Sequence, residues 1–391
     1  MNKFDFNQIS QINYLDNLSI SIIPQNILIR MNDIFNCTLN DIDRYISFET
    51  QANNEYLKSK EIVAEFLNCN REEIIYTKNT TESINILAYG LTKNLEKGDE
   101  IILSQQEHDS NFLIWQKIAK EKDLKINLIK HNSNGEIDIN DLKFKINQKT
   151  KIASISGCSS ILGYLQDLEG ISNIIKEKNK DVFINYDLAS YIPFRKVDLK
   201  KINADSICFS AQKLYSPIVM GILFINEKSL SHFEEILIGS NSVSKITKND
   251  YLLYKDYNRL EYGTKNIIGA IALGYSINYL EELGYENIEE NNKKIIDKFL
   301  KYIKNNKKLN FINIQDKNNK APIFSFTLDN IPNKRFVETL RENDIICSES
   351  NFGNIFFLSQ NNIESVIRFS FGLFVEESDI DNLISVLDDI L

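Results

Sequence analysis

An aspartate and a lysine stand at the ends of two apolar runs in the middle of this 391-residue chain. One run ends at Asp187, a second ends at Ser210 with Lys213 just after it, and a third spans residues 221–225. Short apolar runs of this kind are typical of strands that are buried on both faces of a sheet. In open α/β sheets, ligands bind at the rim beyond the strand ends. We therefore expect Asp187 and Lys213 to face one ligand site.

A carboxylate and an amine at one rim suit pyridoxal phosphate (PLP). The carboxylate can pair with the ring nitrogen of PLP, and the lysine can form a Schiff base with its aldehyde carbon. The lysine must first lose a proton, which burial and nearby cations promote by lowering its pKa. Taken singly, each residue has a plainer interpretation, as a strand-end carboxylate and as one lysine among many.

The flanking residues favour the cofactor site, because they resemble that of the class V aminotransferase superfamily. The resemblance is strongest to cysteine desulfurases of the SufS and NifS type, which read roughly D-G-A-Q and F-S-G-H-K-L-x-G-P. Residues 187–190 read D-L-A-S and residues 209–217 read F-S-A-Q-K-L-Y-S-P. The resemblance implies that Lys213 forms the Schiff base and that Asp187 pairs with the pyridine nitrogen.

Two positions in these segments depart from the family pattern. Ser190 stands where a glutamine usually contacts the cofactor phenolate, and Gln212 replaces the histidine before the lysine. With Ser210, they are expected to belong to the cofactor-binding residues.

A hydroxyl-rich turn follows the strand expected at residues 73–77 and reads K-N-T-T-E-S-I-N. A turn that leads into a helix presents backbone N–H groups, and here the hydroxyls of Thr80 and Thr81, to an anion. A plain capping box from Asn79 to Glu82 is the alternative. The resemblance to the family's G-T-T-E-A-I-N implies that the two threonines bind the cofactor phosphate.

A histidine follows the next expected strand, residues 100–103. The segment S-Q-Q-E-H-D-S-N around His108, with W-Q after it, resembles the family's S-Q-x-E-H-H-A-N-x-x-x-W-Q. The resemblance implies that the neutral ring of His108 stacks on the cofactor, where it can also relay protons. Without that resemblance, a lone histidine is more often a surface or helix-cap residue.

Two residues are expected to bind the substrate carboxylate. Ser160 stands in S-S-I-L-G, where the family has an asparagine in S-N-V-L-G. Arg368 stands in V-I-R-F-S, which resembles C-R-A-S-L or L-R-V-S-P. A guanidinium can hold a carboxylate bidentately, a geometry that lysine cannot reproduce. The alternative for Arg368 is a purely structural role.

One segment points to a second subunit. The residues R-L-E-Y-G-T-K-N resemble R-F-E-A-G-T-P-N, in which the threonine reaches the cofactor phosphate of the neighbouring subunit. The resemblance implies a homodimer with composite sites, to which Thr264 contributes.

The elements that position these residues follow from apolar spacing and from the resemblance. Helical spacing from residue 24 to 67 predicts two helices. The resemblance implies an α/β fold like that of PLP-dependent aspartate aminotransferase, with a mostly parallel seven-stranded sheet and a smaller C-terminal α+β domain. We expect an N-terminal arm on the small domain (1–20), a large PLP-binding domain (21–269) and a small domain (270–391).

The composition restricts the kinds of molecule that the protein is expected to bind. The net charge is −9 with both signs interspersed, so neither nucleic acid nor an anionic membrane is expected. The five cysteines and three histidines show no metal-site spacing, which predicts a reduced, cytoplasmic protein with no metal site. No apolar run is long enough to cross a bilayer, and we expect no export signal. The expected partner is a small amino-acid substrate.

The resemblance fails at the loop that carries the nucleophilic cysteine of desulfurases, R-x-G-H-H-C or S-S-G-S-A-C. Residues 345–353 read I-I-C-S-E-S-N-F-G, which places Gly353 at the cysteine position. Cys347 comes six positions earlier and is expected to be a small buried residue. Cys158, near the rim, is the other thiol that could take the role.

We therefore predict a PLP-dependent C–S lyase that acts by β-elimination, with Lys213 as the base and without a protein persulfide. An aminotransferase or amino-acid epimerase of the same superfamily is the enzymatic alternative. A PLP-binding scaffold partner is the non-enzymatic alternative, against which the joint presence of Lys213, Asp187, His108 and Arg368 argues.

Overall fold

The computed structural model describes residues 5–6, 12–38, 42–234, 236–312 and 319–391. The side chains of residues 36–38 and 42–52 lie outside the description, and Cys37 is among them. Part of the predicted N-terminal arm, residues 1–4 and 7–11, also lies outside it.

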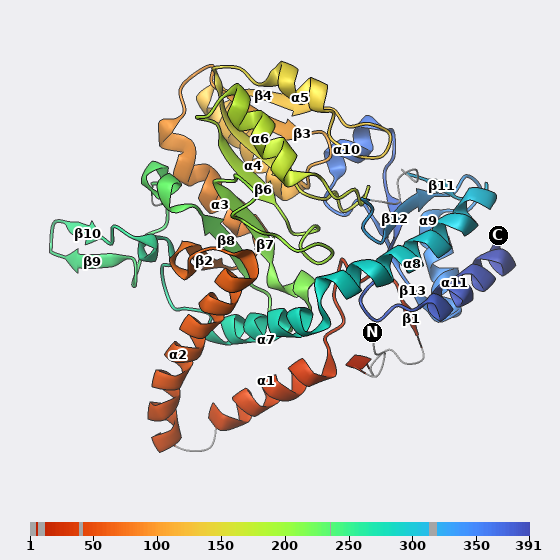
Figure 1. Ribbon diagram of the computed structural model, residues 1–391, viewed down its shortest axis with the longest axis horizontal. Coiled ribbons are helices and arrows are strands. Elements are labelled where there is room, and N and C mark those ends of the chain that lie inside the picture. Colours follow the sequence, from red (N-terminus) through yellow and green to blue (C-terminus); the bar gives the residue numbers. More distant parts are fainter. Residues whose placement is uncertain (1–4, 7–11, 39–41, 235, 313–318) are drawn as a thin grey trace.

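A seven-stranded sheet in the order β2-β8-β7-β6-β5-β3-β4 forms the centre of the larger part of the molecule (Figure 1). Strand β8 is antiparallel to both neighbours, whereas the other neighbouring pairs are parallel. The predicted mostly parallel sheet is therefore confirmed. Its strands are β2 (Ile74–Thr77), β3 (Glu100–Ser104), β4 (Lys125–Ile129), β5 (Thr150–Ser156), β6 (Phe183–Asp187), β7 (Ser206–Ser210) and β8 (Gly221–Ile225).

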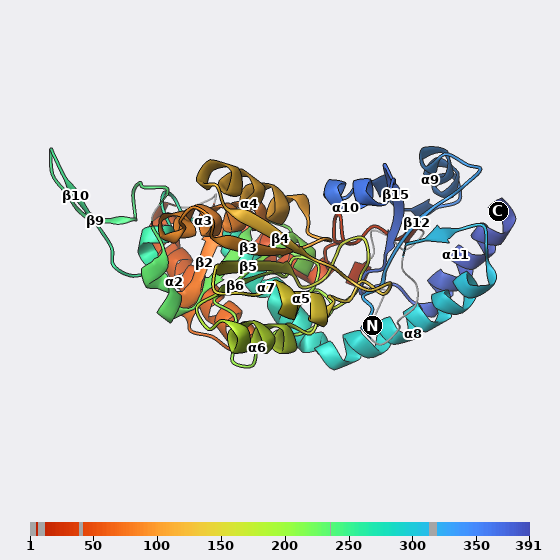
Figure 2. The ribbon, with the colours of Figure 1, turned by 90° about the horizontal axis from the view of Figure 1, so that it is seen from above.

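Helices cover both faces of this sheet, which explains its near-continuous apolar strands. Alternate residues of β3 pack in different cores: Ile101 and Leu103 pack with residues of α3 and α4, and Ile102 packs with residues of α6 and α7. Helices α4 and α6 lie on opposite sides of the sheet (Figure 2). The bounds are α3 (Thr80–Leu91), α4 (Asp109–Lys122), α5 (Ile139–Lys145), α6 (Leu168–Lys178) and α7 (Ile267–Leu283).

The sequence before the sheet forms the two expected helices, α1 (Gln25–Thr38) and α2 (Ile42–Leu67), and α2 packs against α7. A hairpin of β9 (Val243–Ile246) and β10 (Tyr251–Leu253), which the sequence did not suggest, projects from the end of the molecule opposite to the C-terminus (Figures 1 and 2). Short 3-10 helices are η2 (Arg71–Glu73), η3 (Thr92–Asn94), η4 (Ala211–Leu214), η5 (Glu227–His232) and η6 (Tyr257–Leu260).

The C-terminal part is built on a four-stranded antiparallel sheet in the order β11-β12-β15-β14. Strand β1 of the N-terminal region pairs in parallel with β13 of this part. The division into arm, large domain and small domain stays a prediction. The elements are β1 (Asn13–Tyr14), α8 (Tyr285–Asn305), β11 (Asn310–Phe311), β12 (Ile323–Thr327), α9 (Asn333–Glu342), β13 (Ile345–Ile346), β14 (Ser348–Ser350), α10 (Ile355–Gln360), β15 (Val366–Ser370) and α11 (Glu377–Ile390).

Across the described ranges, every helix is too short or too polar to cross a lipid bilayer.

Candidate active site

A cavity of about 220 Å³ opens at the rim of the large sheet, beyond the carboxyl ends of β5, β6 and β7. Register places Asp187, the last residue of β6, beside Cys208 of β7, three residues before η4 begins. The parallel strands thus deliver their following loops to one edge, as expected for a ligand site. The sequence-predicted residues that line the cavity are Thr80, Thr81, His108, Ser160, Asp187, Ser190, Ser210, Gln212 and Lys213.

Lys213 stands on η4, directly after β7, and its Nζ donates to Ser190 Oγ at 3.2 Å. Burial lowers the pKa of Lys213 to about 8, although the nearby Asp187 carboxylate opposes the shift; the Arg368 guanidinium adds to it. An amine with this pKa is partly neutral near pH 7, as a nucleophile or base must be.

Asp187 is buried, and its Oδ1 accepts the N–H of Ala189 at 3.0 Å. Burial raises the pKa of the carboxyl, whereas that hydrogen bond and Lys213 act in the opposite direction. A cationic ring nitrogen beside it would favour the ionised form, so its place in the cavity suits the role expected from the sequence.

The N-terminus of α3 also lines the cavity. Asn79 caps the helix by accepting the N–H of Glu82 at 2.9 Å, but the Glu82 carboxylate accepts the N–H of Lys78 and not that of Asn79, so the alternative of a capping box is only half formed. The hydroxyl of Thr80 is buried and has no hydrogen-bond partner among the described residues, and the same holds for Oε1 of Gln212. The unpaired hydroxyl of Thr80 can donate, and its place at a helix N-terminus fits a bound phosphate.

Gly221 holds this turn close to the sheet. A Cβ at this first residue of β8 would lie 2.2 Å from Thr77 Oγ1 and 2.4 Å from the carbonyl carbon of Asn79. A side chain there would push the turn outward, so glycine allows the helix start to reach the cavity.

His108 is the N-cap of α4. Its Nδ1 contacts Ser110 Oγ at 2.7 Å and accepts the N–H of Ser110 at 3.2 Å. Burial lowers the pKa of His108 to about 4, and the Lys213 and Arg368 cations add to this, so the ring is neutral near pH 7. Gly353, which has a φ of +67°, packs against the ring: a Cβ there would lie 2.2 Å from His108 Nε2.

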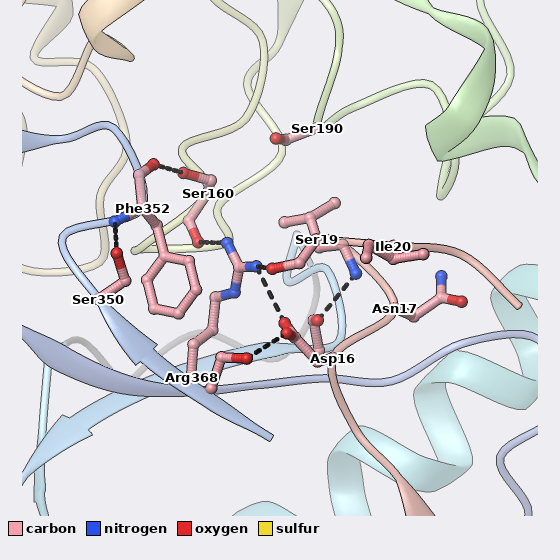
Figure 3. A network of polar contacts seen from close by, with 12 residues as sticks. Asp16, Asn17, Ser19, Ile20, Ser160, Ser190, Ser350, Phe352 and Arg368 are labelled. Carbon is pink, nitrogen blue, oxygen red and sulfur yellow. Dashed lines mark hydrogen bonds and ion pairs between the residues drawn. The ribbon is translucent and has the colours of Figure 1, made fainter. Parts of the chain in front are cut away.

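Arg368 lies beside the cavity in a network with the N-terminal region (Figure 3). Its Nη2 donates to Asp16 Oδ1 at 3.3 Å and to Ser19 Oγ at 2.6 Å, and its Nη1 donates to the carbonyl of Ser160 at 3.4 Å. The carboxylate that Arg368 contacts here therefore belongs to Asp16. The expected substrate-binding roles of Arg368 and Ser160 stay predictions.

Sequence reasoning missed Asp16 and Glu107 as parts of the site. Asp16 is buried and also accepts Ser348 Oγ at 2.5 Å. Glu107 is buried next to His108, its Oε1 accepts Ser104 Oγ and the N–H of Ser156, and burial raises its pKa to about 7. The signals were present in the sequence, since Asp16 belongs to the segment Y-L-D-N and Glu107 directly precedes His108.

Thr264 lies outside this cavity. It is exposed and lines a separate cavity of about 320 Å³ beside Tyr56, Tyr262 and Lys265. Its segment is anchored by Glu261, which accepts the hydroxyl of Tyr56 at 2.9 Å. One chain does not bring Thr264 to Lys213, so its expected role toward a neighbouring subunit stays a prediction.

The described cysteines near the site are buried thiols. Cys347 is 1% exposed, as expected, and burial raises its pKa. Cys158 lines the cavity, and burial raises its pKa to about 12 despite nearby cations. Neither thiol is a thiolate near neutral pH.

A half-buried lysine, a buried aspartate and a helix N-terminus around one cavity at the rim of a mostly parallel sheet define a PLP-dependent enzyme. The model of the family Aminotransferase class-V matches residues 13–383, and the chain belongs to this family.

Relatives cover almost the whole chain. The chain is 33% identical over 390 residues to a probable cysteine desulfurase of Borreliella burgdorferi. That alignment covers 97% of this chain and 91% of the relative. The chain is 28% identical over 383 residues to a probable cysteine desulfurase of Pyrococcus abyssi, with 97% and 94% covered.

Solved structures share the fold. The apo structure of a cysteine desulfurase from Thermococcus onnurineus NA1 superposes with a TM-score of 0.93 at 26% identity, covering 99% of this chain and 96% of that one. A complex of the cystine C-S lyase C-DES with its reaction product has a TM-score of 0.85 at 18% identity, covering 98% and 99%; this second likeness concerns the fold alone.

Proposed function

We propose that this protein is a PLP-dependent C–S lyase that cleaves a sulfur-bearing α-amino acid by β-elimination, without a protein persulfide. The relatives named cysteine desulfurases support a carbon–sulfur bond as the target. The observation that carries the persulfide-free proposal is the packing of Gly353 on the His108 ring, where the desulfurase pattern has its cysteine. Protonated, buried Cys347 and Cys158 support it, because the thiolate is the reactive form.

The residues around the cavity have separate roles in binding the cofactor and the substrate. PLP, when bound, withdraws electrons from the substrate's α carbon. The Asp187 carboxylate holds the ring nitrogen, and Thr80, Thr81, Ser210 and Gln212 hold the phosphate. Arg368 binds the substrate carboxylate.

Proton transfer falls to Lys213, which takes the proton from the α carbon. The α C–H and β C–S bonds break, and the sulfur leaves with the electron pair of its bond and is protonated. Water then converts the remaining enamine to pyruvate and ammonia. His108, neutral near pH 7, places an uncharged ring beside the reacting atoms without adding a competing cation.

Cofactor attachment is tested by trapping. Borohydride reduction of the PLP-loaded protein, followed by peptide mass spectrometry, should find the adduct on Lys213, and Lys213→Ala should lose it. Lys320 is the matched control, because it is even more buried than the half-buried Lys213 and its pKa is also lowered to about 8. Lys320→Gln should keep the adduct on Lys213. An adduct on a different lysine would refute the assignment.

Product analysis tests the reaction. Cysteine or cystine should yield pyruvate and ammonia in equal amounts, with sulfide from the former and cysteine persulfide from the latter. Cys347→Ser and Cys158→Ser should keep this activity. Alanine formed with a trapped persulfide on either cysteine would show a desulfurase. A keto acid that retains sulfur would show an aminotransferase, a D-amino acid an epimerase, and an unchanged cofactor spectrum with every amino acid a scaffold.

We also propose that the enzyme is a homodimer in which Thr264 completes the phosphate site of the partner. The exposure of Thr264 away from its own chain's cavity supports this arrangement. Exposed apolar residues on the projecting hairpin, Ile246, Tyr251 and Leu252, add a surface that a second copy can cover.

A cytoplasmic location is part of the proposal. Cys69, Cys158, Cys208 and Cys347 are free thiols in the described structure, which suits a reducing compartment. Fractionation of the native cell, with the protein recovered among cytoplasmic markers, is the corresponding test.

A further inference from the structure

Phe352 stacks directly on the guanidinium of Arg368 (Figure 3). The Cζ atom of Arg368 lies 3.7 Å from the centre of the Phe352 ring, within the range of a cation–π contact. Phe352 reaches this place with a φ of +48°, and Gly353 after it has a φ of +67°. A left-handed backbone is unusual for a bulky side chain, so surrounding contacts must stabilise it.

Those contacts fix the loop relative to the cavity. The side-chain amide of Asn354 donates to the carbonyl of Phe352 at 2.7 Å and to Ser160 Oγ at 2.8 Å. The carbonyl of Gly353 accepts the N–H of Asp109 at 2.6 Å. The loop is thus tied to Ser160, which lines the cavity, and to the first residue of α4, so the Phe352 ring has one defined position over Arg368.

Some hydrogen-bond donors of the Arg368 guanidinium are paired and one is not. Nη2 donates to both Asp16 and Ser19, which uses both of its hydrogens, whereas Nε is buried and has no partner among the described residues. A bidentate contact along the Nε–Nη2 edge therefore needs one acceptor to leave. Asp16 is buried, but Ser19 is exposed, so Ser19 is the partner that an incoming carboxylate can replace.

We propose that Phe352 is the positioning residue for substrate recognition: its ring holds the plane of the Arg368 guanidinium so that the Nε–Nη2 edge receives the α-carboxylate of the substrate in place of the Ser19 hydroxyl. This inference rests on the proposed function and deepens it, because it names the residue that sets the geometry in which Arg368 receives the α-carboxylate. Amines without the carboxylate gain nothing from the arrangement.

The effect is measured in ligand binding. The PLP-loaded enzyme is titrated with L-alanine, which has no β-leaving group, and with ethylamine, its decarboxylated counterpart, while the absorbance of the bound cofactor is followed. Phe352→Ala should weaken the affinity for alanine by roughly tenfold, the size of one lost cation–π contact in a desolvated site. The affinity for ethylamine should stay the same, and Phe352→Tyr should restore alanine binding.

Phe356 supplies the matched control. It is half-buried like Phe352, lies four residues further along, and stacks on Phe112 with ring centres 4.5 Å apart, not on Arg368. Phe356→Ala should leave the affinity ratio of alanine to ethylamine unchanged. Ser19→Ala should keep or increase the affinity for alanine, because it removes the competing acceptor.

Steady-state kinetics separates positioning from a general loss of structure. With cysteine, Phe352→Ala should raise KM about tenfold and leave kcat within about twofold. If the wild-type spectrum responds to no amino acid, the proposed function fails. If wild type responds and Phe352→Ala binds alanine equally well, or loses both ligands alike, the role of Phe352 alone is refuted.

Discussion

Burial sets the protonation of the three cationic or neutral side chains around the cavity. It lowers the pKa of Lys213 to about 8, of His108 to about 4 and of Arg368 to about 10. At neutral pH, therefore, Arg368 keeps its charge for a carboxylate, His108 has none, and Lys213 stands near its titration point. This combination suits a base and an anion-binding group that act side by side.

The pH dependence of proton abstraction follows from Lys213. The base is the neutral amine, so exchange of the α-hydrogen of L-alanine in D₂O, followed by NMR, should rise roughly tenfold from pH 6 to 7 and level off above about pH 8. Because His108 titrates near pH 4, its protonation should cause no further change in the exchange rate between pH 6 and 9. An exchange rate that is flat from pH 6 to 8 would exclude Lys213 as the titrating base.

At the scale of elements, the loop between β14 and α10 is shaped around the absence of a side chain at Gly353. Gly353→Ala should cost about 1–2 kcal/mol for the left-handed backbone and more for the displaced His108 ring. Gly98→Ala is the control, because Gly98 has a φ of +86° and nothing within 4 Å of a Cβ. Urea unfolding should show a larger loss for Gly353→Ala, with an altered cofactor spectrum in that variant only. If the two variants lose the same free energy of unfolding and have the same cofactor spectrum, the loop accommodates a side chain at position 353 and the prediction is wrong.

A second element-scale contact joins the lysine turn to the rest of the molecule. The hydroxyl of buried Tyr215, at the end of η4, accepts the side-chain amide of Asn17 and the N–H of Leu373, both at 3.0 Å. Tyr215→Phe leaves both donors unpaired and should lower the free energy of unfolding by about 1–3 kcal/mol. Tyr302→Phe, which removes a more exposed hydroxyl bonded to Asp388, should cost less in the same denaturation experiment.

At the scale of the whole molecule, two sheets and the N-terminal region meet at Arg368, and the proposed dimer adds a second chain. Mixing Lys213→Ala subunits with Thr264→Ala subunits should restore part of the activity, because one of the two sites in a heterodimer then receives both wild-type residues. Activity of each homodimer, measured alone, gives the baseline. A fully active protein that light scattering shows to be monomeric would contradict the composite site.

The sequence was sufficient to predict that the residues at the ends of strands of the large sheet lie together. Asp187, Lys213, Thr80 and His108 each stand just after an apolar run, and parallel strands bring such positions to one edge whatever the details of packing. That is why the strand ends predicted that these residues share one cavity. The hairpin of β9 and β10 escaped prediction, since its strands are exposed and have no alternating buried face.

Only the tertiary structure decided the environment of Arg368. Its partner Asp16 lies 352 residues away in the chain, and Phe352 reaches it through a backbone conformation that its residue type disfavours. No local pattern encodes such contacts, because they depend on how the small sheet, the N-terminal region and a loop close on one another. The sequence by itself thus determined which groups line the cavity, whereas long-range packing determined which partners Arg368 already has.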